Sequence, residues 1–257
     1  MADRYGKVAK ALPASSILLI RDGMGGVEVL MIERAKTMKF APGAFVFPGG
    51  KVDATDQQNW RWQGITTGRG VYRDFSFRVA ALRELYEEAG VLQIDRPRRN
   101  TLFGGLPFAD LVRYSGGKLD IANMVPFAHW VTPEPMPRRF DTHFYLAEHN
   151  GQVAQHDGNE AVSLKWVNPR KVLSDWEENK VPLMFPTRLN LMKLARSSTA
   201  AGAIQQARRA PVVRTLPVVN MSAAGVKLEI DRATGYAVTS ATEKELAVEA
   251  GGVQKKP

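Results

Sequence analysis

The sequence predicts an α+β protein in which a mixed β-sheet lies between α-helices. Three observations support this: apolar runs of strand length joined by short turns near the N-terminus, one long segment with helical periodicity, and alternating strand-like and helical segments after it. Short turns join antiparallel strands, whereas parallel strands need a long crossover connection. We therefore expect a mixed sheet flanked by helices rather than a purely parallel sheet.

The N-terminal half begins with a predicted hairpin over residues 15–34, in which two apolar runs surround a glycine-rich turn. The clearest helix is residues 75–90, because apolar residues recur there every three or four positions. Ser76 can cap the start of this helix, and Gly90 can end it. Before the helix we expect a short strand at 44–50 and a polar inserted loop at 53–73.

The C-terminal half predicts three strands and two helices, followed by a change of composition. The strands are expected at 125–133, 138–148 and 160–169, and the helices at 169–179 and 186–198. After residue 198 the chain becomes rich in Ala, Gly and Val, with a candidate hairpin at 226–240. We expect one domain over residues 1–197 and an extension over 198–257, which packs on the domain or contacts a second copy in a homodimer.

The composition indicates a globular protein with an anionic partner. The chain has 257 residues and a net charge of +9, from 35 basic and 26 acidic side chains. This charge suits a phosphorylated small molecule, a nucleic acid or an acidic lipid, although a solvated basic face accounts for part of it. The absence of cysteine excludes disulfides and thiolate metal sites. Because no apolar run reaches the ~20 residues of a membrane span and no signal-peptide pattern is present, we expect a cytoplasmic protein without membrane contact.

The predicted helix carries an unusual concentration of carboxylates. Glu84, Glu87 and Glu88 lie three or four residues apart, so all three fall on one helical face. Carboxylates this close repel one another, and a divalent cation with oxygen ligands removes that penalty. Arg83, four residues before Glu87, can orient it or neutralise it in part. The alternative is an ordinary solvated acidic face.

The surrounding residues resemble the Nudix box, whose pattern is G-x5-E-x7-R-E-U-x-E-E-x-G-U, with U an aliphatic residue. Two departures are present. Gly50 and Arg83 lie 33 positions apart where the pattern expects 14, so 19 residues are inserted. Counted back from Arg83, the first glutamate of the pattern falls on Phe75, and Asp74 is its nearest substitute. The matching positions are Gly50, Arg83, Glu84, Leu85, Glu87, Glu88, Gly90 and Val91.

The segment before the box resembles a second signature, L-L-T-x-R-[SA]-x3-R-x3-G-x3-F-P-G-G, which coenzyme A diphosphatases carry. The split box is similar to the branch of the Nudix family that includes the peroxisomal members of this group. Lys39 replaces the second arginine of the signature, and Met31 and Ile32 replace its Leu and Thr. The residues that match are Leu30, Arg34, Ala35, Gly43 and Phe47–Gly50.

The resemblance implies a Nudix fold and a metal-dependent diphosphatase. The expected reaction converts coenzyme A or acyl-coenzyme A to 3′,5′-ADP and (acyl-)phosphopantetheine, with Mg²⁺ or Mn²⁺ as cofactor. The metal ligands it implies are Glu84, Glu87, Glu88 and the carbonyl of Gly49, with Glu84 a ligand or a base. Arg83 and Glu84 are thus expected in the catalytic machinery, and Glu160 is a downstream candidate proton acceptor.

Basic and aromatic residues outside the box provide candidates for substrate binding. Arg34 and Lys39 fill the basic positions of the second signature, and the alternative for them is a surface or packing role. Arg138 and Arg139 lie beside a predicted strand and are candidates for the 3′-phosphate. Trp60 and Trp62 either cover the substrate or, as we favour, anchor the inserted loop. His129 and His143 fall within strand patterns. We expect them in the core or in contact with metal ligands, rather than as metal ligands themselves.

Two other functions remain open on the sequence. The same fold could cleave ADP-ribose, NADH or another dinucleotide. A protein of another class, a non-catalytic nucleotide sensor or a nucleic-acid-binding protein, could use the basic surface. The box keeps its glutamates and residues 198–257 show no helix-turn-helix pattern, so nucleic acid is disfavoured as a partner.

Overall fold

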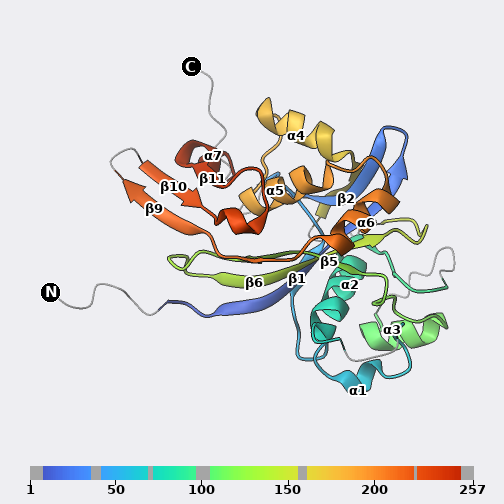
Figure 1. Cartoon of the computed structure of the whole chain (residues 1–257). Coiled ribbons are helices and arrows are strands. Elements are labelled where there is room, and N and C mark those ends of the chain that lie inside the picture. The colour runs from blue at the N-terminus through green and yellow to red at the C-terminus, as the bar shows by residue number, and fades with distance from the viewer. Residues whose placement is uncertain are drawn as a thin grey trace.

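A mixed sheet forms the centre of the protein in the computed structural model, which describes residues 8–35, 42–68, 72–96, 105–155, 161–222 and 225–249 (Figure 1). Within this sheet the strand order is β3-β2-β1-β6-β5-β8, with β4 paired to β1 and β7 paired to β2. The strands are β1 (Ala11–Gly23), β2 (Gly26–Arg34), β3 (Phe45–Val46), β4 (Gly49–Lys51), β5 (Val125–Val131), β6 (Arg139–Glu148), β7 (Ala161–Val167) and β8 (Arg214–Thr215).

The long strand β1 organises the sheet. It pairs in antiparallel with β2 and β4 on one side and in parallel with β6 on the other. The predicted mixed sheet is therefore confirmed. The strand expected at 44–50 is divided into β3 and β4, because Pro48 between them has no N–H for a ladder; its carbonyl instead accepts hydrogen bonds from Ile17 N and Ser16 Oγ.

Helices cover both faces of the sheet (Figure 1). Alternate residues of β1 enter the two cores: Ile17 and Leu19 face the α2 side, and Leu18 and Ile20 face the opposite side, all with 0% exposure. One face carries α1 (Asn59–Trp62), α2 (Phe75–Ala89) and α3 (Phe108–Ser115), and the other carries α4 (Pro169–Glu177), α5 (Phe185–Leu194) and α6 (Ala200–Arg209).

The C-terminal segment adds a second, smaller sheet. The predicted hairpin is present as β10 (Gly225–Glu229) and β11 (Ser240–Thr242), joined through the 3-10 helix η1 (Arg232–Thr234). The strand β9 (Val218–Ser222) pairs with β10, and α7 (Glu243–Glu249) follows β11. Leu228, Ile230 and Ala241 belong to the same core cluster as α6 and the main sheet. The C-terminal segment thus packs on the rest of the chain. The domain boundary at residue 198 stays a prediction.

Two expectations about α2 and the insertion need correction. The helix begins at Phe75, so Ser76 is not its cap; Asp74 occupies the cap position without a capping hydrogen bond from its side chain. The insertion is not a simple loop, because it contains α1 and the buried Trp62, whose Nε1 donates to the Thr55 carbonyl. Gly90 ends α2 as predicted, in the left-handed conformation at φ 66°. Among the described residues, no helix is both long and apolar enough to cross a bilayer.

Candidate active site

The carboxylate end of α2 lies against the glycine pair of β4. The Gly49 N–H donates to Glu88 Oε2 at 2.8 Å. Gly50 leaves room for Glu84, since a Cβ added at Gly50 would lie 2.4 Å from Glu84 Oε1. The fold thus brings together two halves of the box that are separated by the insertion. The observed position of the Glu84 carboxylate requires a residue without a side chain at position 50.

Arg83 lies at the centre of a group of carboxylates, the Arg83 cluster, which comprises Arg83, Asp53, Asp56, Glu84 and Glu87. Its Nη1 donates to Glu84 Oε1 at 3.0 Å and to Glu87 Oε2 at 2.7 Å. Its Nε and Nη2 contact the Asp56 carboxylate at 3.1 and 3.0 Å, and Asp53 Oδ2 lies 3.7 Å from Nη2. Nη2 also donates to the Lys51 carbonyl at 2.8 Å, which ties the helix to β4.

Asp56 is the site residue that the sequence prediction missed. It is fully buried, and its carboxylate accepts the paired hydrogen bonds of Arg83 and one from the Asp53 N–H. Asp56 lies six residues after Gly50, the spacing of the first acidic position in G-x5-E. The count back from Arg83 to Phe75 was wrong, because the extra residues lie between Asp56 and the helix. A count forward from Gly50 would have found Asp56.

Asp74, the substitute proposed for that position, serves another group. Its carboxylate accepts hydrogen bonds from Arg78 Nε at 3.0 Å and from Tyr145 Oη at 2.9 Å. Arg78 Nη1 donates further to the carbonyls of Ile121 and Met124. We call Arg78, Asp74 and Tyr145 the Arg78 cluster; its hydrogen bonds fasten the start of α2 to the sheet.

Negative charge exceeds positive charge in the Arg83 cluster, where four carboxylates surround one guanidinium. Burial would lower the pKa of Arg83, but the hydrogen bond and charge of Asp56 and the charges of Glu84 and Glu87 raise it above its usual value. Burial raises the pKa of Glu84, and the charges of Glu87 and Asp53 raise it further against the opposing effect of Arg83. An added cation would relieve this repulsion.

The residues present fit a hard divalent cation. Glu84 and Glu87 offer oxygen donors, which Mg²⁺ and Mn²⁺ prefer. The side chain of Glu87 is 49% exposed, so this part of the cluster is open to solvent, whereas that of Glu84 is 15% exposed. The Glu84 carboxylate occupies the place that a Cβ at Gly50 would fill.

The other predicted substrate residues have different surroundings or lie outside the described residues. Arg34 ends β2, where its N–H donates to the Ala44 carbonyl. Arg138 is exposed. Arg139 is buried, and its guanidinium donates to the main-chain carbonyls of Thr132 and Ala9. These hydrogen bonds are sufficient to explain why an arginine lies there. Two residues, Lys39 and Glu160, lie outside the described residues.

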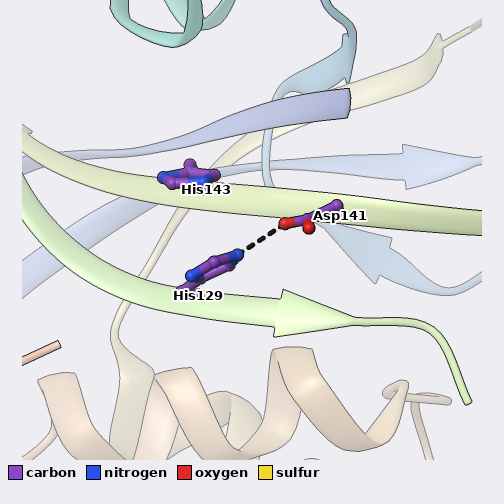
Figure 2. A group of neighbouring side chains, drawn as sticks. All are labelled: His129, Asp141 and His143. Atoms are coloured by element: carbon purple, nitrogen blue, oxygen red, sulfur yellow. Dashed lines mark hydrogen bonds and ion pairs between the residues drawn. The ribbon is translucent and has the colours of Figure 1, made fainter. Parts of the chain in front are cut away.

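The remaining aromatic and histidine residues have distinct surroundings. Trp62 packs against Phe108 at 5.8 Å between ring centroids, an anchoring role for the insertion, whereas Trp60 is 68% exposed. His129 and His143 come together with Asp141 on β5 and β6, and one ligand atom from each lies within 4.8 Å of the others (Figure 2).

Comparison with known proteins decides the family. The sequence model of the NUDIX domain family matches residues 10–185 of this chain. The chain belongs to the Nudix family. A NUDIX hydrolase structure from Alicyclobacillus acidocaldarius is 28% identical, with a TM-score of 0.68 over 79% of this chain and 99% of that one. The family and the fold predicted from the sequence are thus confirmed.

Among curated Nudix relatives, nudix hydrolase 7 of Caenorhabditis elegans is 31% identical over 179 residues, or 65% of this chain and 56% of that protein. The acyl-coenzyme A diphosphatase NUDT19 of Xenopus laevis is 24% identical over 225 residues, 65% of this chain and 59% of that protein. The human NUDT19 is 25% identical over 66% of this chain and 61% of its own length. The chain therefore spans about three fifths of these relatives.

Proposed function

We propose that this Nudix protein is a divalent-metal-dependent hydrolase that cleaves the diphosphate of a nucleoside diphosphate derivative. Our first candidate substrate is coenzyme A or acyl-coenzyme A, giving 3′,5′-ADP and (acyl-)phosphopantetheine. The observation that carries the proposal is the Arg83 cluster beside Gly49 and Gly50, where carboxylates outnumber the single guanidinium. A divalent cation that binds together with a diphosphate supplies the positive charge that this arrangement lacks.

In this proposal Glu84, Glu87, Glu88 and the Gly49 carbonyl hold Mg²⁺ or Mn²⁺. A bound ion of this kind neutralises phosphate charge and lowers the pKa of a coordinated water. Arg83 holds Glu84 and Glu87 in position through Nη1. Asp56, in turn, holds the guanidinium from its other edge, so it is a positioning residue. Glu160 remains the proposed proton acceptor.

Two features support coenzyme A as the substrate. The signature from Leu30 to Gly50 resembles that of coenzyme A diphosphatases, and curated relatives carry the name acyl-coenzyme A diphosphatase. Arg34 and Lys39 are the proposed diphosphate-binding residues. For the 3′-phosphate we now favour Arg138 over Arg139, because the Arg139 guanidinium is occupied by main-chain carbonyls while Arg138 is exposed.

A substrate panel with identified products tests the proposal. The purified chain is incubated with coenzyme A, an acyl-coenzyme A, ADP-ribose or NADH, each with Mg²⁺, with Mn²⁺ and with a chelator, and kcat/KM is compared. We expect metal-dependent 3′,5′-ADP from the first two substrates at the highest kcat/KM. Efficient turnover of ADP-ribose or NADH without 3′,5′-ADP would reject the coenzyme A assignment and keep the hydrolase. No turnover of any substrate would reject both.

A further inference from the structure

Three side chains on neighbouring strands bring metal-type ligand atoms together outside the Arg83 cluster. His129 lies on β5, and Asp141 and His143 lie on β6 (Figure 2). One ligand atom from each lies within 4.8 Å of the other two. We propose that His129, Asp141 and His143 bind a divalent first-row transition metal ion, with zinc as the first candidate.

The register of the two strands creates this group. His129 is directly opposite His143 in the antiparallel β5–β6 pair. Asp141 and His143 are two residues apart on β6, so both side chains project to the same face of the sheet. That face is the one covered by α2, because the Phe77 ring lies 4.1 Å from the His143 ring between centroids. The sheet itself therefore positions all three ligands.

The donor set selects the kind of ion. Two imidazole nitrogens and one carboxylate oxygen suit zinc or iron(II), whereas Mg²⁺ prefers oxygen ligands alone. Each imidazole can offer one ring nitrogen to the ion, since zinc takes histidine as a ligand through Nδ1 or Nε2. Three protein ligands leave at least one coordination position for water or an anionic group.

The present contacts require only a small rearrangement to admit an ion. His129 Nε2 lies 2.5 Å from Asp141 Oδ1, and the two imidazole rings stack at 4.1 Å between centroids. The ligand atoms of one tetrahedral zinc lie about 3.4 Å apart, as bonds of ~2.1 Å dictate. The pair must therefore open by about 1 Å and the rings must turn out of the stack. The side chains of His129 and Asp141 are partly exposed, at 17% and 31%.

This site is separate from the glutamates of α2. Ser15 pairs with Gly50 on one side and with His143 on the other, so the three residues form a row across the sheet. Since neighbouring strands lie ~4.8 Å apart, the Cα atoms of Gly50 and His143 are about 10 Å apart. Among the described residues, the group whose ligand atoms lie within 4.8 Å of one another contains none of the α2 glutamates. The inference therefore does not rest on the proposed hydrolase activity.

Zinc titration of the metal-stripped full chain by calorimetry tests the inference. The variants are His143→Ala, the double variant Glu87→Gln/Glu88→Gln, which removes the acidic site, and His149→Ala. His149 is a matched control, because it is also half-buried but hydrogen bonds to the Gln152 carbonyl instead. We expect the glutamate double variant and His149→Ala to keep one zinc, and His143→Ala to bind it at least 10-fold more weakly. Equal zinc binding by His143→Ala, or none by the glutamate double variant, would overturn the proposal.

A second measurement needs no substitution at the site. Imidazole ¹⁵N NMR of the wild-type chain should show zinc-induced shifts for two histidines, His129 and His143, and none for His149. This experiment decides the matter even where His143→Ala fails to fold. If the His129 and His143 signals do not respond to zinc, the three residues form a hydrogen-bonded His–Asp pair stacked on a second imidazole, and the metal site is rejected.

Discussion

Two buried arginines on α2, Arg78 and Arg83, lie five residues apart and have different surroundings. Their side chains are equally buried, at 7% exposure each. Arg78 is matched by one carboxylate, Asp74, and by the carbonyls of Ile121 and Met124. Arg83 is surrounded by four carboxylates, two of which extend toward solvent with side-chain exposures of 49% and 60%.

From this difference we infer that the Arg78 cluster is structural and that the Arg83 cluster serves the proposed site. In the Arg78 cluster the charges balance within the protein, so no ligand is needed. In the Arg83 cluster the carboxylates outnumber the guanidinium. Burial raises the pKa of Glu84, Arg83 opposes this rise, and the charges of Glu87 and Asp53 add to it. Buried charge surplus costs stability, and clusters of this kind occur where a ligand completes them.

The largest expected effect is on stability, from removing either arginine. Arg78→Met leaves Asp74 without its cation, and Arg83→Met leaves the fully buried Asp56 without its cation. Each should destabilise the fold by about 3–5 kcal/mol, the usual cost of breaking a buried ion pair. Urea unfolding measures both. Hydrolysis is then compared at low temperature, and each rate is divided by the fraction of protein that is folded. The corrected rate should be retained in Arg78→Met and lost in Arg83→Met.

A double variant controls for the cause of the loss. Asp56→Asn combined with Arg83→Met removes both buried charges, so it should recover part of the stability but none of the activity. If Arg78→Met also abolished hydrolysis in the folded state, the division between a structural and a functional cluster would be wrong.

The second effect is on catalysis alone. Glu87→Gln keeps the shape of the side chain but removes a charge proposed to hold the metal, and several kcal/mol of metal-derived stabilisation corresponds to a fall in kcat of roughly 10²–10³-fold. Glu87 is half-exposed, and Arg83 keeps its ion pair with Asp56 in this variant. The free energy of unfolding should therefore change by less than about 1 kcal/mol. The exposed Glu177 of α4 provides a matched control, since Glu177→Gln should change neither quantity. Undiminished turnover by Glu87→Gln would reject the proposal that Glu87 binds the metal.

Much of this comparison was accessible from sequence. The spacing of apolar residues predicted helix α2, Phe75–Ala89, almost to the residue. The spacing of the glutamates predicted that they share one face of this helix. Both predictions depend only on local sequence. The strands β5, β6 and β7 were likewise predicted by their alternating patterns. Helix α6 was missed because only alanines of its apolar face, Ala200, Ala203 and Ala207, are buried, and these give a weak period.

The remainder depended on contacts between distant parts of the chain. The parallel pairing of β1 with β6 joins segments more than a hundred residues apart, and no local pattern predicts it. The spacing from Gly50 could have indicated Asp56, but its pairing with Arg83 depends on how the insertion folds back onto α2. The group of His129, Asp141 and His143 likewise depends on the register between β5 and β6, although both strands were predicted.

A smaller effect comes from the glycine pair that meets the Arg83 cluster. An alanine Cβ at Gly50 would lie 2.4 Å from Glu84 Oε1, the end of a movable side chain, whereas one at Gly49 would lie 2.5 Å from the Ser15 carbonyl, which is fixed in the ladder. Gly49→Ala should therefore cost about 1–3 kcal/mol of stability. Gly50→Ala should fold nearly as well and lose roughly 10–100-fold in kcat, because Glu84 is displaced.

Thermal unfolding and steady-state kinetics on the two alanine variants measure this contrast. The reverse result, with Gly50→Ala unfolded and Gly49→Ala fully active, would mean that the contact between Gly50 and Glu84 serves packing rather than the site.

The smallest effect is an opposite dependence of stability on pH in the two clusters, measured in chelator by urea unfolding between pH 3 and pH 8. Burial would raise the pKa of Asp74, but the hydrogen bond and charge of Arg78 and the hydrogen bond of Tyr145 lower it below 3.8. Asp74 therefore stabilises the fold above pH ~4 and ceases to do so as the pH falls through its folded pKa, so Asp74→Asn should flatten the acid limb of the curve.

Glu84 has the opposite sign, because its folded pKa lies above 4.5, chiefly through burial. Its contribution is present below the unfolded pKa and is lost as the pH rises through the folded value. Glu84→Gln should therefore gain stability relative to wild type between pH ~4 and neutrality, and Mg²⁺ should erase this gain by stabilising the ionised wild-type cluster. If Glu84→Gln and Asp74→Asn instead changed the pH profile in the same direction, Glu84 would be held as firmly by Arg83 as Asp74 is by Arg78. The Arg83 cluster would then need no cation.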